Sequence, residues 1–118
     1  MELLKMEFPL NREIMTTMRL VTGGVCSLVG FDIDSAEDLK VCVTESLLLL
    51  LHGGSARAQV RFVKAERLQI SLTGEGGAAE ESFVEEEISV ALLSALVDDL
   101  SVEKEEGVTR ITFGFGTL

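Results

Sequence analysis

The stretch that decides the fold is residues 34–52, Asp-Ser-Ala-Glu-Asp-Leu-Lys-Val-Cys-Val-Thr-Glu-Ser-Leu-Leu-Leu-Leu-Leu-His. Asp34 and Ser35 are favourable helix caps, and two acids follow in the first turn, where the positive helix end stabilises them. The later residues are apolar over much of a helical circumference, so we expect the most buried helix of the chain here. Glu45 stands among those apolar residues.

A second amphipathic helix is predicted upstream, beginning after Asn11, which is a good cap residue. Gly23 and Gly24 lie inside its apolar stripe, where each costs about 1 kcal/mol relative to alanine. A close backbone approach, to another helix or a second subunit, or a kink would explain them. The stripe repeats every three or four residues, as one buried helical face does: Ile14, Met18, Val21, Val25 and Leu28.

Alternating apolar residues predict strands on both sides of these helices. Residues 3–10 suit an edge strand that ends at Pro9. Residues 58–63 and 68–73 predict a β-hairpin with one buried face, joined by a polar turn. After an acidic loop, 74–81, we expect a helix over residues 85–100 and strands over 100–104 and 108–115.

This order of elements predicts a two-layer α/β (α+β) sandwich formed by a single domain, residues 1–118. Two helical runs separate groups of strands. We therefore expect a mixed, mostly antiparallel sheet with three helices on one face.

Charge is distributed unevenly along the chain. Between Gly74 and Glu106 there are 11 acidic residues and one base, which gives −10, whereas the remainder has 9 acids and 9 bases. Phosphate contacts need Lys and Arg, so nucleic acid is excluded as a partner. A basic protein partner would fit this segment; a solvated acidic loop and helix start is the alternative.

The chain shows no sign of membrane insertion or secretion. Its longest uninterrupted apolar run, residues 47–51, is far too short to span a bilayer, and the N-terminus lacks a signal-peptide layout. We expect a cytoplasmic protein. Cys26 and Cys42 lie in apolar helical patterns, which favours two buried thiols over a disulfide. No Cys/His cluster has metal-ligand spacing, and His52 before two glycines is expected to end a helix.

Residues 37–46, Glu-Asp-Leu-Lys-Val-Cys-Val-Thr-Glu-Ser, resemble the helix that carries the catalytic glutamate in the histidine-kinase-like ATPase family. The segments 8–10, 18–25, 68–76, 91–102 and 107–113 also resemble parts of that fold, in the same order. The chain is most similar to its small bacterial branch, the anti-sigma-factor serine kinases. The resemblance implies the sandwich fold and covers most of the chain.

The resemblance also implies the positions of the nucleotide site, and this chain departs from the family at most of them. Glu45 aligns with the general base. The asparagine that holds magnesium is Leu49 here, and leucine offers no oxygen to a hard cation. The aspartate that recognises adenine is Gly74, although the glycine at Gly76 remains.

The phosphate-binding glycine box is also replaced. It aligns with a segment that contains Glu86, Glu87 and Ser89, and two carboxylates there oppose the binding of a polyanion. The loop that forms the ATP lid in the family is cut to a few residues. Glu45 is then a vestige facing a filled pocket, a solvated or paired carboxylate, or a residual catalytic base.

These departures predict a non-catalytic regulatory module resembling an anti-sigma factor, with no cofactor, no metal and no ATP binding. The implied partners are a sigma factor, an anti-sigma antagonist or another signalling domain. Arg19 aligns with an arginine that contacts the sigma factor; a solvent-facing arginine is the alternative. The first helix could also support a homodimer. An active ATP-dependent serine kinase and a small-molecule sensor that uses the altered pocket are the competing functions.

Overall fold

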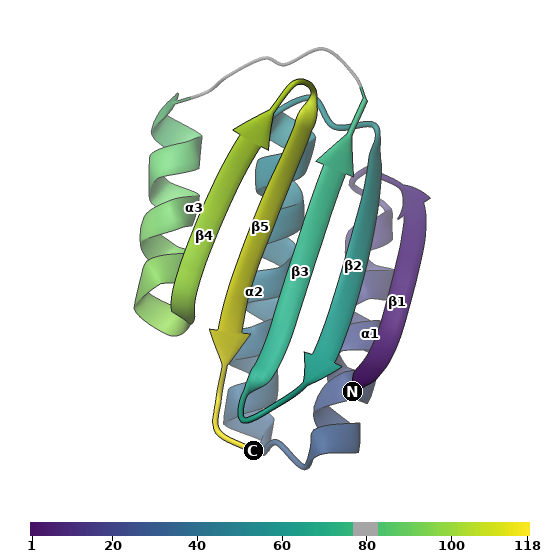
Figure 1. The fold of residues 1–118 in the computed structure, drawn as a ribbon, viewed down its shortest axis with the longest axis vertical. Helices are drawn as coiled ribbons and strands as arrows, with labels where there is room; N and C mark the ends of the chain where they lie inside the picture. The colour runs from purple at the N-terminus through teal and green to yellow at the C-terminus, as the bar shows by residue number, and fades with distance from the viewer. Residues whose placement is uncertain (77–82) are drawn as a thin grey trace.

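The structure, a computed structural model, describes residues 1–76 and 83–118 and has two layers (Figure 1). One layer is a sheet of five strands, and the other contains the three helices, all on the same face of the sheet. The two-layer sandwich is therefore confirmed. The elements are β1 (Glu2–Pro9), α1 (Ile14–Val29), α2 (Ile33–His52), β2 (Arg57–Lys64), β3 (Leu68–Glu75), α3 (Phe83–Leu96), β4 (Asp98–Glu105) and β5 (Val108–Phe115).

The strand order in the sheet is β1-β2-β3-β5-β4. Every pairing between neighbouring strands is antiparallel, where a mixed sheet was predicted. The predicted hairpin is present as β2 and β3, and β1 is an edge strand that ends at Pro9, as predicted. The last strand, β5, lies between β3 and β4 rather than at an edge.

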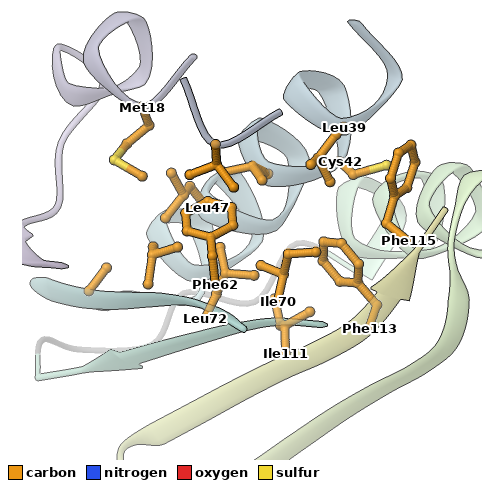
Figure 2. Packing of buried hydrophobic residues seen from close by; sticks show 14 of the residues in the cluster. Met18, Leu39, Cys42, Leu47, Phe62, Ile70, Leu72, Ile111, Phe113 and Phe115 are labelled. Carbon is orange, nitrogen blue, oxygen red and sulfur yellow. The ribbon is translucent and has the colours of Figure 1, made fainter. Parts of the chain in front are cut away.

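The core lies between α2 and the sheet, because strand residues of period two turn one apolar face toward the helices. Figure 2 shows the side chains of the two layers meeting. Leu39, Cys42 and Leu47 come from α2, and none of them is exposed to solvent. The sheet contributes buried residues from its central strands, namely Phe62, Ile70, Leu72, Ile111 and Phe113.

Helix α2 begins two residues earlier than the sequence predicts. Its cap is Asp32, not Asp34, and the Asp32 Oδ1 accepts a hydrogen bond of 2.8 Å from the Ser35 backbone N–H. That hydrogen bond lowers the pKa of the Asp32 carboxyl. The helix ends at His52, as predicted, and the Gly53 N–H donates to the Leu49 carbonyl.

Helix α1 runs unbroken past its two glycines, so the glycines do not mark a helix break. Asn11 Oδ1 accepts a hydrogen bond of 3.0 Å from the Ile14 N–H, which is the predicted capping role. A Cβ at Gly23 would lie 3.2 Å from Cε of Lys40, so this glycine permits a close approach of α2. A Cβ at Gly24 would meet nothing within 4 Å.

The third helix is shorter than predicted. It ends at Leu96 rather than at residue 100, and Asp98 starts β4. Residues 98–100 belong to a strand because Leu100 and Val102 both pack against the core. Residues two positions apart share one face in a strand but not in a helix. Asp99 has φ +53° at a register shift between Asp98 and Ser101.

The two cysteines are free and buried, in agreement with the sequence-based prediction. Burial is the main cause that raises the pKa of Cys26, and it raises the pKa of Cys42 to about 12. The predicted acidic loop, 74–81, lies mostly outside the described residues, as does the part of the chain that would correspond to a shortened lid.

Candidate functional site

Helices α2 and α3 lie side by side, and a hydrogen bond joins them at the predicted base position (Figure 1). Ser89 Oγ donates to Oε2 of Glu45 over 3.0 Å in a partly buried setting. Ser89 itself is buried and half-buried Glu45 lies opposite it. Two residues that the sequence assigns to separate parts of the nucleotide site are thus brought together. Of the three interpretations of Glu45 given above, this contact corresponds to the paired carboxylate.

Packing closes the space beside Gly74, the residue that the resemblance predicts at the position of the adenine-recognising aspartate. A Cβ built on Gly74 would lie 2.4 Å from Oγ of Ser55 and 2.9 Å from Cδ2 of Leu50. Both distances are shorter than real Cβ contacts allow. Ser55 is buried and held in place, because its backbone N–H donates to the Leu50 carbonyl over 3.0 Å. No side chain fits at Gly74 unless Ser55 and Leu50 shift.

Leu49, which the resemblance predicts at the position of the magnesium ligand, is half-buried and packs against the hydrophobic core. Gly76 has φ +79°, which L side chains rarely adopt, and a Cβ there would lie 3.5 Å from the Cβ of Ala56. Gly76 is therefore explained by backbone conformation at the end of β3.

The two acidic residues predicted at the position of the phosphate-binding glycine box, Glu86 and Glu87, lie in different environments. Glu86 Oε1 forms an ion pair of 2.6 Å with Nζ of Lys104, which ties α3 to β4. Glu87 is exposed. Glu86 is thus paired with Lys104, the single base of the acidic segment 74–106.

Arg19 lies apart from this cluster, on α1. Its Nε donates to Oγ1 of Thr44 over 3.5 Å, a long hydrogen bond between α1 and α2. Arg19 remains exposed, while Thr44 is buried. Glu45, Gly74 and Ser89 belong to α2, β3 and α3, respectively. Arg19 contacts a different side of α2, the side on which α1 packs.

Sequence reasoning missed the residues that close the site. Ser55 and Leu50 fill the space beside Gly74, and Lys104 neutralises Glu86. Lys104 carried a signal, since it is the one base in the acidic segment. Ser55 carried none, because a serine after two glycines is typical of any loop.

Two further observations concern metal-binding clusters and membrane-spanning helices. Within residues 1–76 and 83–118, no three His, Cys, Asp or Glu side chains are grouped so that they could bind a metal ion. In the same part of the chain, no helix is both long and apolar enough to cross a membrane.

The chain resembles known proteins in sequence and in structure. No family model matches the chain. The serine-protein kinase RsbW of Bacillus pumilus is 26% identical over 133 residues, which covers 92% of this chain and 82% of the relative. RsbW of Bacillus subtilis is 24% identical over 129 residues, covering 90% and 81%.

Two solved structures share the fold. A crystal structure of the RsbU and RsbW domains of a Mycobacterium tuberculosis protein has a TM-score of 0.75 at 16% identity. It matches 98% of this chain, which spans only 33% of that longer chain. The SiaB–SiaC complex from Pseudomonas aeruginosa gives a TM-score of 0.69 at 14% identity, covering 97% and 89%. The chain thus has the histidine-kinase-like ATPase fold.

By sequence, the two relatives described above are serine-protein kinases named RsbW.

Proposed function

We propose that this chain is a non-catalytic regulatory protein that keeps the anti-sigma kinase scaffold, binds a protein partner and does not bind ATP. The observation that carries the proposal is the contact at Gly74, where Ser55 and Leu50 stand within 3 Å of any added Cβ. An aspartate at this position would recognise the adenine amino group in a nucleotide-binding relative. Here neither that side chain nor the space for it is present.

The other nucleotide contacts are replaced in a consistent way. Magnesium takes oxygen ligands, and Leu49 supplies none while it packs against the core. Phosphate favours helix N-termini with free backbone N–H groups and positive potential. The corresponding part of α3 presents Glu86 and Glu87 instead. The residues therefore do not fit Mg-ATP, and Glu45 has no bound nucleotide on which to act as a base.

A protein partner is supported by the comparisons and by the surface. The RsbW relatives are protein kinases, and one structural neighbour is a complex of two proteins, SiaB and SiaC. We propose a sigma factor, an anti-sigma antagonist or another signalling domain as the partner, with Arg19 among the contacts. The Thr44 hydrogen bond would hold that arginine at the α1 surface.

We also propose that α1 supports a homodimer. Leu20 and Leu28 are 74% and 70% exposed, and Gly24 lies one turn from each with open space around it. Arg19 is the only charged residue in this helix, so two copies of an acidic protein could approach there without strong repulsion.

Isothermal titration with ATP and magnesium tests the loss of nucleotide binding. We expect no binding heat with this chain and clear binding with Bacillus subtilis RsbW measured in parallel. Binding of ATP to this chain at micromolar strength would overturn the proposal. Sedimentation velocity of the wild type and of Leu20→Ser tests the homodimer separately, because only a dimer formed through α1 would dissociate in the variant.

A further inference from the structure

The outer sides of α2 and α3 form a surface that the proposed loss of nucleotide binding does not explain. Ile88 and Leu92 of α3 are 64% and 38% exposed, and Val41 of α2 is 39% exposed. With Glu45 and the half-buried Leu48, these residues define what we call the α2/α3 surface. Exposed large apolar side chains gathered between two helices mark an interaction site more often than scattered ones do.

Helix geometry brings these residues together. The helices are antiparallel, since α3 runs down toward the end of the sheet where α2 begins (Figure 1). Val41 precedes Glu45 by one turn, and Leu92 follows Ser89 by about one turn. Glu45 and Ser89 are hydrogen-bonded to each other. Val41 and Leu92 therefore both lie about one turn from that hydrogen bond, on the side toward the first residues of α2.

The charge of this surface is negative. Glu45 is its carboxylate, and Ser89 is the one hydrogen-bond partner of that carboxylate among the described residues. Asp34 and Asp38 are exposed on the first half of α2, where Lys40 is already paired with Glu37 over 3.0 Å. Residues 83–96 contain no Lys or Arg. The α2/α3 surface is thus an exposed apolar strip bordered by acidic residues, and α3 contributes no basic residue to it.

We propose that the α2/α3 surface binds a basic amphipathic helix of the protein partner, with Glu45 as the acceptor of an ion pair from a Lys or Arg. The apolar side of that helix would cover Ile88, Leu92 and Val41. This inference rests on the proposed regulatory binding function and assigns Glu45 a recognition role in place of a base. The partner's helix is identified only by its chemistry.

A helix fits this surface better than an extended segment. A peptide that adds a strand gains affinity from unpaired backbone groups at a sheet edge, and two helices present none. Recognition here depends on side chains, which a helix supplies at positions separated by three, four and seven residues. A second copy of this chain is disfavoured, because its α2/α3 surface carries the same acids and no base.

Selection from a phage-displayed library of helical peptides against the immobilised full chain tests the proposal. We expect selected peptides to combine apolar residues at helical spacing with at least one Lys or Arg. In NMR titrations of the labelled chain, the shifted amides should cluster at Val41, Glu45, Ile88 and Leu92. Selected peptides without a basic residue, or shifts that centre on α1, would overturn the proposal.

Three variants refine the test. Glu45→Gln keeps an oxygen that can accept the Ser89 hydrogen bond but removes the charge, so we expect about tenfold weaker peptide binding. Leu92→Ser should weaken binding as well, while Val63→Ser, at a half-buried position on the face of the sheet away from the helices, should leave it unchanged. If Leu92→Ser does not fold, as judged by circular dichroism, Val41→Ser takes its place. Unchanged affinity in Glu45→Gln, or concentration-dependent shifts at Ile88 without peptide, would contradict the proposal.

The ATP titration described above separates the two proposals. Nucleotide binding together with Glu45-dependent peptide binding would refute the proposed loss of ATP binding and leave the α2/α3 surface standing. Absence of both would refute the surface alone.

Discussion

The interior of this protein, between α2 and β3, and the outer α2/α3 surface are built from the same helix but differ in almost every physical respect. Inward, Leu50 presses against Gly74 so closely that even a methyl group has no room. Outward, Val41 and Ile88 leave much of their apolar area in water. The closed side contains Gly74, on which the proposed loss of nucleotide binding rests, and the open side contains Glu45.

The comparison shows that one helix can be tightly packed on its inner side and leave apolar side chains exposed on its outer side. On the inner side, Ser55 and Leu50 pack against Gly74, and apolar burial contributes roughly 25 cal/mol per Å² to stability. On the outer side, the half-buried Glu45 carboxylate accepts a hydrogen bond from Ser89 Oγ. Perturbations of the interior should therefore cost much more than perturbations outside.

The largest effect is expected for Gly74→Asp, which introduces the residue type that the resemblance predicts here in nucleotide-binding relatives. The new side chain must displace Ser55 and Leu50 and place a carboxylate in a buried position, so we expect a loss of more than about 3 kcal/mol of unfolding free energy. Urea unfolding followed by circular dichroism measures it. Gly24→Asp, at an exposed position of α1 with open space around it, is a control for the added charge. A stable Gly74→Asp variant that binds ATP would break the contrast between interior and surface.

Alkaline pH should destabilise the interior next. The pKa of Cys42 rises from an ordinary 9.0 to about 12 in the folded protein. Above pH 9 the unfolded thiol loses its proton and the folded one keeps it, so stability is complete below that pH and falls as pH rises toward 12. At about pH 10.5 the loss should be about 2 kcal/mol.

Unfolding free energies of the wild type and Cys42→Ala between pH 8 and 11 check this expectation. The variant should show a flatter pH dependence, with the contribution of Cys26 remaining. An equally steep decline in the variant would mean that other groups dominate.

A smaller loss, about 1 kcal/mol, is expected for Ser89→Ala at the boundary between the two regions. The substitution removes the donor to Glu45, but the carboxylate is only half-buried and water can replace the hydroxyl. Thermal unfolding measures the change, and Ser89→Thr, which keeps a hydroxyl, is the matched variant. A loss of several kcal/mol would show that Glu45 belongs to the interior rather than to the surface.

The smallest effect, opposite in sign, is expected for Gly24→Ala on the outer side of α1. Alanine favours a helix over glycine by about 0.8 to 1 kcal/mol, and its Cβ would meet open space. Gly23→Ala should gain less, because Lys40 must shift its Cε. Comparison of the two melting temperatures gives the result; an equal gain would mean that the Lys40 stem moves freely.

Sequence reasoning predicted much of the fold, since hydrophobic periodicity is a local signal. The strands of the hairpin, the edge strand before Pro9 and the helix end at His52 are as predicted. The predicted end of α3, at residue 100, was wrong, because the apolar residues around Leu100 suit either a helix or a strand. Pairing with β5 decides between them, and that pairing is a long-range contact.

The site was less predictable than the fold. Alignment with a family brought Glu45, Gly74 and Ser89 to attention, but only the structure shows that Ser89 meets Glu45 and that Ser55 fills the space beside Gly74. The cap at Asp32 instead of Asp34 shows the same limit on a local scale, since both residues have the right side chain.

The position of β5 between β3 and β4 has a consequence for how the chain assembles. Among the described strands, β4 is at the edge of the sheet and pairs with β5 alone. Only residues 106–107 separate β4 from β5, so the two strands can pair locally as a hairpin. Pairing of β5 with β3 is a contact between residues far apart in sequence, and contacts of this kind slow folding. We therefore expect docking of the β4–β5 hairpin on β3 to be slower than formation of the hairpin itself.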